Sequence, residues 1–263
     1  MCLIAFAWRC APGYRLVVAS NRDEFHERPT RAADFWSDAP HILGGRDLRD
    51  GGSWMGLSAS GRFAALTNHR NPAALRDAPR SRGHLVADYL RADQPAADYA
   101  TLVAGQRRSY NGFNLLVGDL DALWYVGDQG DTPTPVAPGI HALSNARLDT
   151  PWPKATGLSA ALDAELTGHS SEDRLVDGLL RELADTTQAS DDALPDTGID
   201  RERERQLSAR RIVDMRYGTR SSTVLLLRED GRARLDELSY GSDGRPGQRV
   251  TRLWPRPAAF LAA

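Results

Sequence analysis

A cysteine directly follows Met1, and this position lets one residue carry two reactive groups. If Met1 is removed, Cys2 has both a thiol and a free α-amine. The α-amine titrates near pH ~8, so it can act as the general base for its own thiol. The pair predicts an N-terminal nucleophile that attacks an amide or related acyl bond. The alternative interpretation is a cysteine that is simply buried in a first strand.

A polar cluster is predicted to lie beside Cys2. Two β-rich runs at 2–9 and 15–20 flank a turn signal, which predicts a hairpin. Its register places Cys2 opposite Asp23, give or take about two residues. A carboxylate there can hold the α-amine, and an arginine can lower the thiol pKa. The alternative is a charged strand end that forms surface salt bridges. The cluster comprises Asn21, Arg22, Asp23 and Glu24.

Three further polar positions occur where predicted strands begin or end. Asn68 and Asn145 each follow a short apolar run. An Asn amide placed there can donate to an oxyanion, which contributes ~2.7–4 kcal/mol per donor in acyl transfer. Arg220 lies in a polar run that opens an apolar strand, and it can bind a substrate carboxylate or stabilise charge. The alternative for each Asn is an ordinary turn residue.

The elements that must position these side chains follow from the hydrophobic periodicity. Strands are predicted at 2–9, 15–20, 54–58, 62–68, 113–117, 122–126, 141–145, 222–228 and 233–240. Helices are predicted at 83–91, 96–107, 154–166 and 172–184. Helix pairs grouped between strand clusters favour a layered α+β fold. Ser81 and Ser170-Ser171 are predicted N-cap positions.

Composition excludes several classes of function. The chain has 263 residues, 41% of them hydrophobic, and a formal net charge of −2. The length suits one large domain or two small ones, and we expect a single domain over 1–263; the charge balance gives no overall pull toward nucleic acid or membranes. The apolar amino-terminal run is too short to span a membrane, and two cysteines cannot form a disulfide framework. We expect a cytoplasmic protein with a surface loop at 185–206, whose RERER run forms a solvated face.

Several motifs in order along the chain resemble those of the NRDE family, the transport-and-Golgi-organisation-type proteins. The resemblance covers residues 2 to about 240 and implies a four-layer αββα fold like that of N-terminal-nucleophile hydrolases. The motifs are Cys2, Asn21-Arg22-Asp23-Glu24, Gly51-Gly52-Ser53-Trp54-Met55-Gly56, Leu66-Thr67-Asn68-His69-Arg70, Ser81-Arg82-Gly83 and Gly218-Thr219-Arg220-Ser221-Ser222-Thr223.

The chain is also distantly similar to cysteine acylases of the choloylglycine hydrolase and penicillin V acylase type. Those enzymes cleave non-peptide amide bonds, and the residues that match theirs in role and order are Cys2, Asp23, Asn68, Asn145 and Arg220. One departure concerns the arginine, because the acylases have Arg-x-x-Asp whereas Arg22 directly precedes Asp23. Neighbours on a strand point to opposite faces, so Arg22 is expected to aim away from Cys2.

The family also implies a competing class, a non-catalytic carrier of haem or a lipid-like ligand. His69 is the only histidine beside the predicted site, and no metal-ligand spacing occurs. The hydrolase needs no cofactor and acts on a small molecule, which Asn21, Arg22, Trp54 and His69 are expected to contact. The aromatic residues Trp8, Trp36, Trp54 and Tyr217 can line an apolar pocket or simply pack in the core. The pairs Gly44-Gly45 and Gly51-Gly52 are predicted turn glycines.

Overall fold

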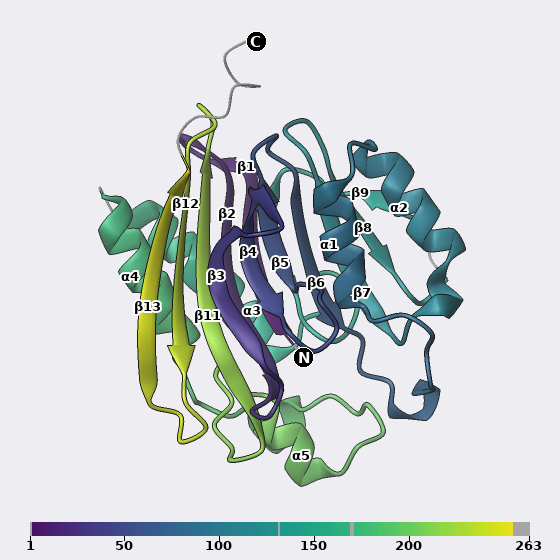
Figure 1. Ribbon diagram of the computed structural model, residues 1–263. Coiled ribbons are helices and arrows are strands. Elements are labelled where there is room, and N and C mark those ends of the chain that lie inside the picture. Colours follow the sequence, from purple (N-terminus) through teal and green to yellow (C-terminus); the bar gives the residue numbers. More distant parts are fainter. Residues whose placement is uncertain (1, 131, 169–170, 255–263) are drawn as a thin grey trace.

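The computed structural model describes residues 2–130, 132–168 and 171–254, with only the backbone of Cys2 (Figure 1). Within this part, strands form two antiparallel sheets. Sheet A contains, in spatial order, β10 (Gly139–Leu143), β1 (Cys2–Ala11), β2 (Tyr14–Phe25), β11 (Tyr217–Arg228), β12 (Ala233–Tyr240) and β13 (Pro246–Trp254). Sheet B contains β3 (Thr30–Trp36), β4 (Ala39–Asp47), β5 (Met55–Ser58), β6 (Phe63–Asn68), β7 (Phe113–Gly118), β8 (Leu123–Gly127) and β9 (Thr134–Pro135).

Helices cover the outer face of each sheet. The first pair, α1 (Gly83–Arg91) and α2 (Ala96–Gly105), packs on sheet B. The second pair, α3 (Pro153–Gly168) and α4 (Glu172–Leu183), packs on sheet A. The result is the predicted four-layer αββα sandwich (Figure 1). Shorter helical turns are η1 (Pro72–Ala74), η2 (Arg107–Ser109), η3 (Asp191–Ala193) and α5 (Arg201–Gln206).

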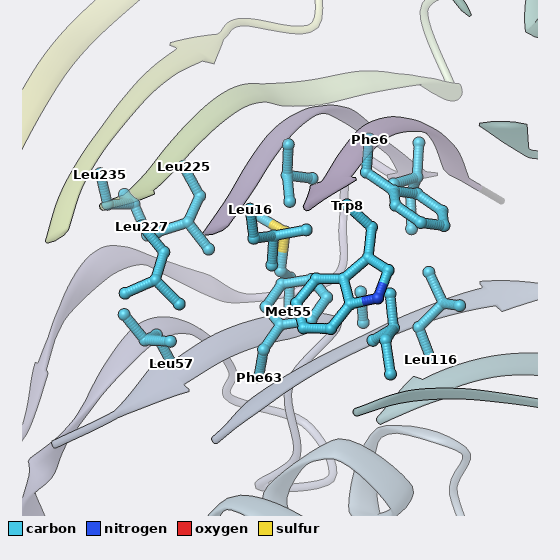
Figure 2. Packing of buried hydrophobic residues seen from close by; sticks show 14 of the residues in the cluster. Phe6, Trp8, Leu16, Met55, Leu57, Phe63, Leu116, Leu225, Leu227 and Leu235 are labelled. Carbon is cyan, nitrogen blue, oxygen red and sulfur yellow. The ribbon is translucent and has the colours of Figure 1, made fainter. Parts of the chain in front are cut away.

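Alternation along β1 and β2 divides their side chains between two cores. Phe6 and Leu16 face sheet B in the layer between the sheets (Figure 2). Leu3, Ala5 and Ala19 face the helices α3 and α4 instead. Small residues on that face let the helices approach closely, whereas the layer between the sheets holds larger side chains. Because both faces are covered, these strands have continuous apolar runs rather than clean alternation.

The four predicted helices are confirmed, each ending within two residues of its predicted bounds. Four strands were missed: β3, β4, β9 and β13. The exposed run Pro246–Arg249 opens β13, an edge strand that needs little apolar surface. The aromatic residues named above, Trp8, Trp36, Trp54 and Tyr217, are all buried, as core packing requires.

The predicted hairpin is confirmed, with a register one residue from the central expectation. Ile4 pairs with Ser20, and the backbone of Cys2 pairs with Arg22 rather than Asp23. An irregularity between Trp8 and Ala11 precedes the turn and shifts the count. The strand β2 extends well beyond residue 20 because β11 pairs with it as far as Phe25. The polar cluster therefore lies inside a strand.

Two local predictions about turns and caps were wrong. Gly44 and Gly45 lie within β4, and a Cβ on Gly45 would stand 2.1 Å from the Trp54 ring, so close packing explains the glycine. Ser81 does not cap α1, whose N-cap is Arg82 without a side-chain hydrogen bond. Ser171 does cap α4, accepting from the backbone amide of Arg174.

The segment 185–206 is mostly exposed loop, as predicted, but it ends in the short helix α5. Its RERER run is not entirely solvated. Glu204 is 2% exposed and turns inward from α5. None of the helices in the described ranges is long and apolar enough to span a membrane.

Candidate functional site

A pocket of about 80 Å³ opens where the strands β2, β4 and β6 end beside the start of α1. It adjoins a groove of about 480 Å³, and the two share Arg28, Ser81 and Arg82. Most of the side chains around the pocket are charged or polar. The pocket is lined by Arg22, Asp23, Glu24, Arg28, Asp47, Ser53, Trp54, Leu66, Asn68, Ser81, Arg82 and Gly83.

Arg22 is buried at the pocket wall, on the face of sheet A that looks toward sheet B. Its guanidinium lies 4.2 Å from the centre of the Trp54 ring, and Nη1 donates to Thr30 Oγ1 at 3.0 Å. Among the described residues no carboxylate forms a recorded ion pair with it. A cation on an aromatic face with one neutral acceptor retains capacity to stabilise a nearby negative charge.

Asp23 is 1% exposed and also borders the pocket. Its Oδ1 accepts from Thr219 Oγ1 at 2.7 Å, and its backbone carbonyl accepts from the Tyr217 hydroxyl at 3.1 Å. Burial raises the pKa of the Asp23 carboxyl, while the charge of Lys154 and the Thr219 hydrogen bond act in the opposite direction. The carboxyl is therefore held in place by β11 and sensitive to nearby charge.

The two predicted asparagines meet, but they occupy different positions. Asn68 is one of the residues that line the pocket. Asn145 is fully buried behind it and does not appear in the pocket wall. The Nδ2 of Asn145 donates to the carbonyl of Asn68 at 2.8 Å. The geometry thus makes Asn145 a support for the end of β6, and leaves Asn68 as the asparagine at the pocket wall.

Three of the predicted residues point elsewhere. Arg220 is the extra residue of a bulge in β11, and its Nη1 donates to the carbonyls of Phe25 and Arg28 at 2.9 and 3.1 Å. His69 places Nδ1 3.1 Å from the Asp128 carboxylate. Asn21 is buried on the helix side of sheet A, where its Nδ2 donates to the carbonyls of Leu183 and Arg210, each at 2.8 Å.

The side chain of Cys2 lies outside the described residues, so its role as nucleophile stays a prediction. The backbone of Cys2 is described, and it begins β1 opposite Arg22. This places the amino end of β1 beside the strand that carries Arg22 and Asp23.

Sequence reasoning missed an ion-pair cluster at the pocket rim. Arg28 grips Asp47 with Nε and Nη2 at 3.0 and 2.5 Å, and Nη2 also reaches Asp50 at 2.6 Å. Burial alone would raise the pKa of Asp47, but the paired Arg28 outweighs it and lowers that pKa. Arg28 lies in the turn after β2, whereas Asp47 ends β4 and Asp50 follows it, so no local pattern could have revealed the cluster.

A second missed group lies behind the pocket. It comprises Lys154, Thr219, Arg70 and Glu204. Thr219 and Arg70 fall within the motifs quoted above, so the sequence could have indicated a role for them. Neither Lys154 nor Glu204 was indicated as a buried residue by the sequence. Lys154 opens a predicted helix and Glu204 lies in a run predicted to be solvated, and charged residues in such places normally face solvent. No group of three or more His, Cys, Asp or Glu side chains in the described part could hold a metal ion.

Comparison with known proteins identifies close relatives. Residues 1–242 match the family described as Transport and Golgi organisation 2. The chain is 42% identical over 264 residues to the Transport and Golgi organization protein 2 homolog of Bos taurus, covering 92% of this chain and 95% of that protein. The homolog of Homo sapiens is 37% identical over 260 residues, covering 91% and 93%.

Two solved structures have a similar outline. A C2A mutant of conjugated bile acid hydrolase from Clostridium perfringens aligns with a TM-score of 0.48 at 8% identity, covering 97% of each chain. A Caenorhabditis elegans N-acylethanolamine-hydrolyzing acid amidase ortholog aligns with a TM-score of 0.44 at 12% identity, covering 67% of this chain and 85% of that one.

Proposed function

The chain belongs to the Transport and Golgi organisation 2 family, and we propose that this member hydrolyses an amide or related acyl bond with Cys2 as nucleophile. One observation supports this most, the pairing of position 2 with Arg22 in the β1–β2 ladder. Directly paired positions of an antiparallel ladder share one face of the sheet. The sequence predicts that Arg22 aims away from the nucleophile; the pairing of position 2 with Arg22 instead supports our proposal that Arg22 faces it.

The proposed reaction has two halves. The free α-amine of Cys2 takes the thiol proton, and the thiolate attacks the carbonyl carbon to form a C–S bond. The C–N bond then breaks, and the departing amine takes a proton from the α-ammonium. Water attacks the resulting thioester, its proton passes through the α-amine to the leaving thiolate, and the carboxylic acid is released. Atoms balance with water as the sole co-substrate.

Each neighbouring side chain has a proposed role. Arg22 favours the thiolate and so lowers the pKa of the Cys2 thiol. Asp23 holds the α-ammonium when it forms. Asn68 donates its side-chain amide to the oxyanion, and Asn145 keeps the end of β6 in position for that contact. Arg220 supports the site only indirectly, through the turn after β2.

The lining of the pocket favours a polar substrate over a haem or lipid-like cargo. The pocket holds about 80 Å³, whereas sites for drug-sized ligands usually hold ~300–1,000 Å³. The adjoining groove is larger, but its described lining is also mainly charged or polar. A haem face or a long acyl chain would gain little by burial there. We therefore propose a small polar amide, with part of the molecule in the groove.

The test begins with intact-mass measurement of the purified protein, because a retained Met1 would block the α-amine. Iodoacetamide labelling across a pH range, followed by peptide mass spectrometry, then compares Cys2 with the exposed Cys10 in the same chain. A panel of fluorogenic amides with polar and apolar acyl groups measures turnover.

We expect loss of Met1, alkylation of Cys2 at lower pH than Cys10, and turnover that Cys2→Ser abolishes. Equal reactivity of the two thiols would remove the basis for a nucleophile. Haem titration of wild type and of Cys2→Ala tests the alternative function, that of a haem carrier. We expect no change in haem absorbance that differs between the two proteins.

A further inference from the structure

A buried ion pair joins the pocket strand to the distant helix α5. Arg70 follows β6 by two residues, and its Nη1 lies 2.5 Å from Glu204 Oε2. The side chains are only 5% and 2% exposed. The other oxygen of Glu204, Oε1, accepts from the backbone amide of Thr197 at 3.0 Å. Both charges are thus removed from water and matched to each other.

Arg70 also makes the contacts that fix the two asparagines. Its backbone amide donates to the carbonyl of Asn145 at 2.8 Å, and its Nη2 lies 3.4 Å from Asn145 Oδ1. Asn145 in turn donates to the carbonyl of Asn68 at 2.8 Å. An unbroken chain of contacts therefore leads from Glu204, through Arg70 and Asn145, to Asn68 at the pocket wall.

A buried pair of this kind is a poor source of net stability, because desolvating both charges offsets most of their attraction. Apolar residues of similar size would often hold the fold equally well. What apolar residues could not supply is the directed contact between the guanidinium and Asn145 Oδ1. Because Glu204 fixes the guanidinium of Arg70, the contact with Oδ1 restricts the rotation of the Asn145 amide, which apolar packing alone does not do.

We infer that Arg70, locked by Glu204 of α5, is a positioning residue that orients Asn145 and thereby Asn68 at the pocket wall. The inference rests on the proposed function for its catalytic meaning. Its structural content, a dependence of the β6 end on α5, stands separately. On this inference the segment 197–206, which contains none of the motifs of the site, helps to set the geometry of the pocket.

The experiment replaces the pair as a unit and uses two readouts. Arg70→Met with Glu204→Leu removes both charges, so neither is left buried alone and the protein should fold. Glu202→Gln is the matched control, an exposed acid on the same helix that pairs only with Arg205 among described residues. Hydrogen exchange by NMR follows the backbone amide of residue 70, with amides of Ala64 and Ala65 in the middle of β6 as references.

We expect protection of the residue 70 amide to fall roughly 10-fold in the pair variant while the β6 references keep theirs. With an amide substrate, kcat should fall about 10- to 100-fold with KM unchanged. Alkylation of Cys2 should change much less than kcat, since Lys154 and Thr219 still act on the Asp23 carboxyl when the charge of Arg70 is removed. Glu202→Gln should change none of these.

Unchanged exchange at residue 70 in the folded pair variant would overturn the inference, whatever the activity. If the wild type shows neither turnover nor an activated thiol, the proposed function fails instead, and hydrogen exchange still decides whether Arg70 orients the β6 end. A change in exchange with kcat unaffected would overturn the catalytic part of the inference.

Discussion

Arg22 is a cation with no recorded ion pair in the part of the protein that the structure describes, although its charge acts on the carboxyls of Asp47 and Glu237. It lies in the wall of the pocket, stacked on Trp54 and bonded to a single hydroxyl. A positive charge within ~4–6 Å of an acidic group typically lowers the pKa of that group by 1–3 units. We propose that Arg22 lowers the pKa of the Cys2 thiol, and replacing Arg22 tests this directly.

Replacing Arg22 by Met should raise the pKa of the Cys2 thiol, because the thiolate loses its cation. At neutral pH the rate of iodoacetamide labelling of Cys2 should fall at least about 10-fold. Arg220→Met is the comparison, since that guanidinium binds two carbonyls of the turn after β2. It should leave the labelling rate within about 3-fold of wild type. Equal losses in both variants would contradict the assignment of roles.

The sequence revealed the residue types of the site better than their directions. The position of Asp23 near the start of β1 was predictable from the hairpin register, and that of Asn68 was predictable because it ends the apolar run of β6. The direction of Arg220 was not, because it depends on a bulge in β11 that shifts one residue out of the ladder. The burial of Glu204 was equally unpredictable, because its partner Arg70 lies just beyond the end of β6, far away in the sequence.

At the scale of elements, the segment between β4 and β5 packs beneath Arg22. The Trp54 ring, which directly precedes β5, lies under the guanidinium. Gly45 permits this arrangement, because its missing side chain makes room for the Trp54 indole. The helices and the first hairpin were predictable from periodicity alone. The packing of Trp54 on Gly45 was not predictable, since a glycine pair in a sequence indicates a turn as readily as a close approach of two strands.

Gly45→Ala should destabilise the protein by about 1–3 kcal/mol, as overpacking in a filled core usually does. The new Cβ would stand 2.1 Å from the Trp54 ring, which must then move from beneath Arg22. Urea denaturation followed by circular dichroism measures the change. Gly105→Ala at the end of α2, where a Cβ meets nothing within 4 Å, is the control. It should be neutral or stabilise by up to about 1 kcal/mol, and equal losses would show that the contact with Trp54 is unimportant.

At the scale of the whole molecule, a buried carboxyl helps to join the two sheets. Glu237 of β12 accepts from the backbone amide of Ala33 in β3 at 2.8 Å and from Thr223 Oγ1 at 3.2 Å. Its side chain lies in the layer between the sheets, where burial raises the pKa of its carboxyl. A raised pKa means that the folded state binds the proton more tightly than the unfolded chain does.

This carboxyl should make stability depend on pH. Its contribution is fully present below the unfolded pKa of about 4.3 and is lost as pH rises through the higher folded value. Glu237→Gln removes that dependence, so the variant should gain stability relative to wild type as pH increases toward neutrality. Denaturant unfolding at several pH values measures the difference. The exposed Glu229→Gln serves as control, and a gain that does not vary with pH would contradict the expectation.

The central place of β2 in sheet A has a consequence for how the protein is made. Its two neighbours are β1, which leaves the ribosome first, and β11, which emerges only after most of the chain. At ~5–20 residues per second, translation of the intervening segment takes roughly ten seconds or more. During that interval sheet A cannot close around the first hairpin. Under the proposed function, removal of Met1 would therefore have an interval of several seconds before β11 completes the sheet beside β2.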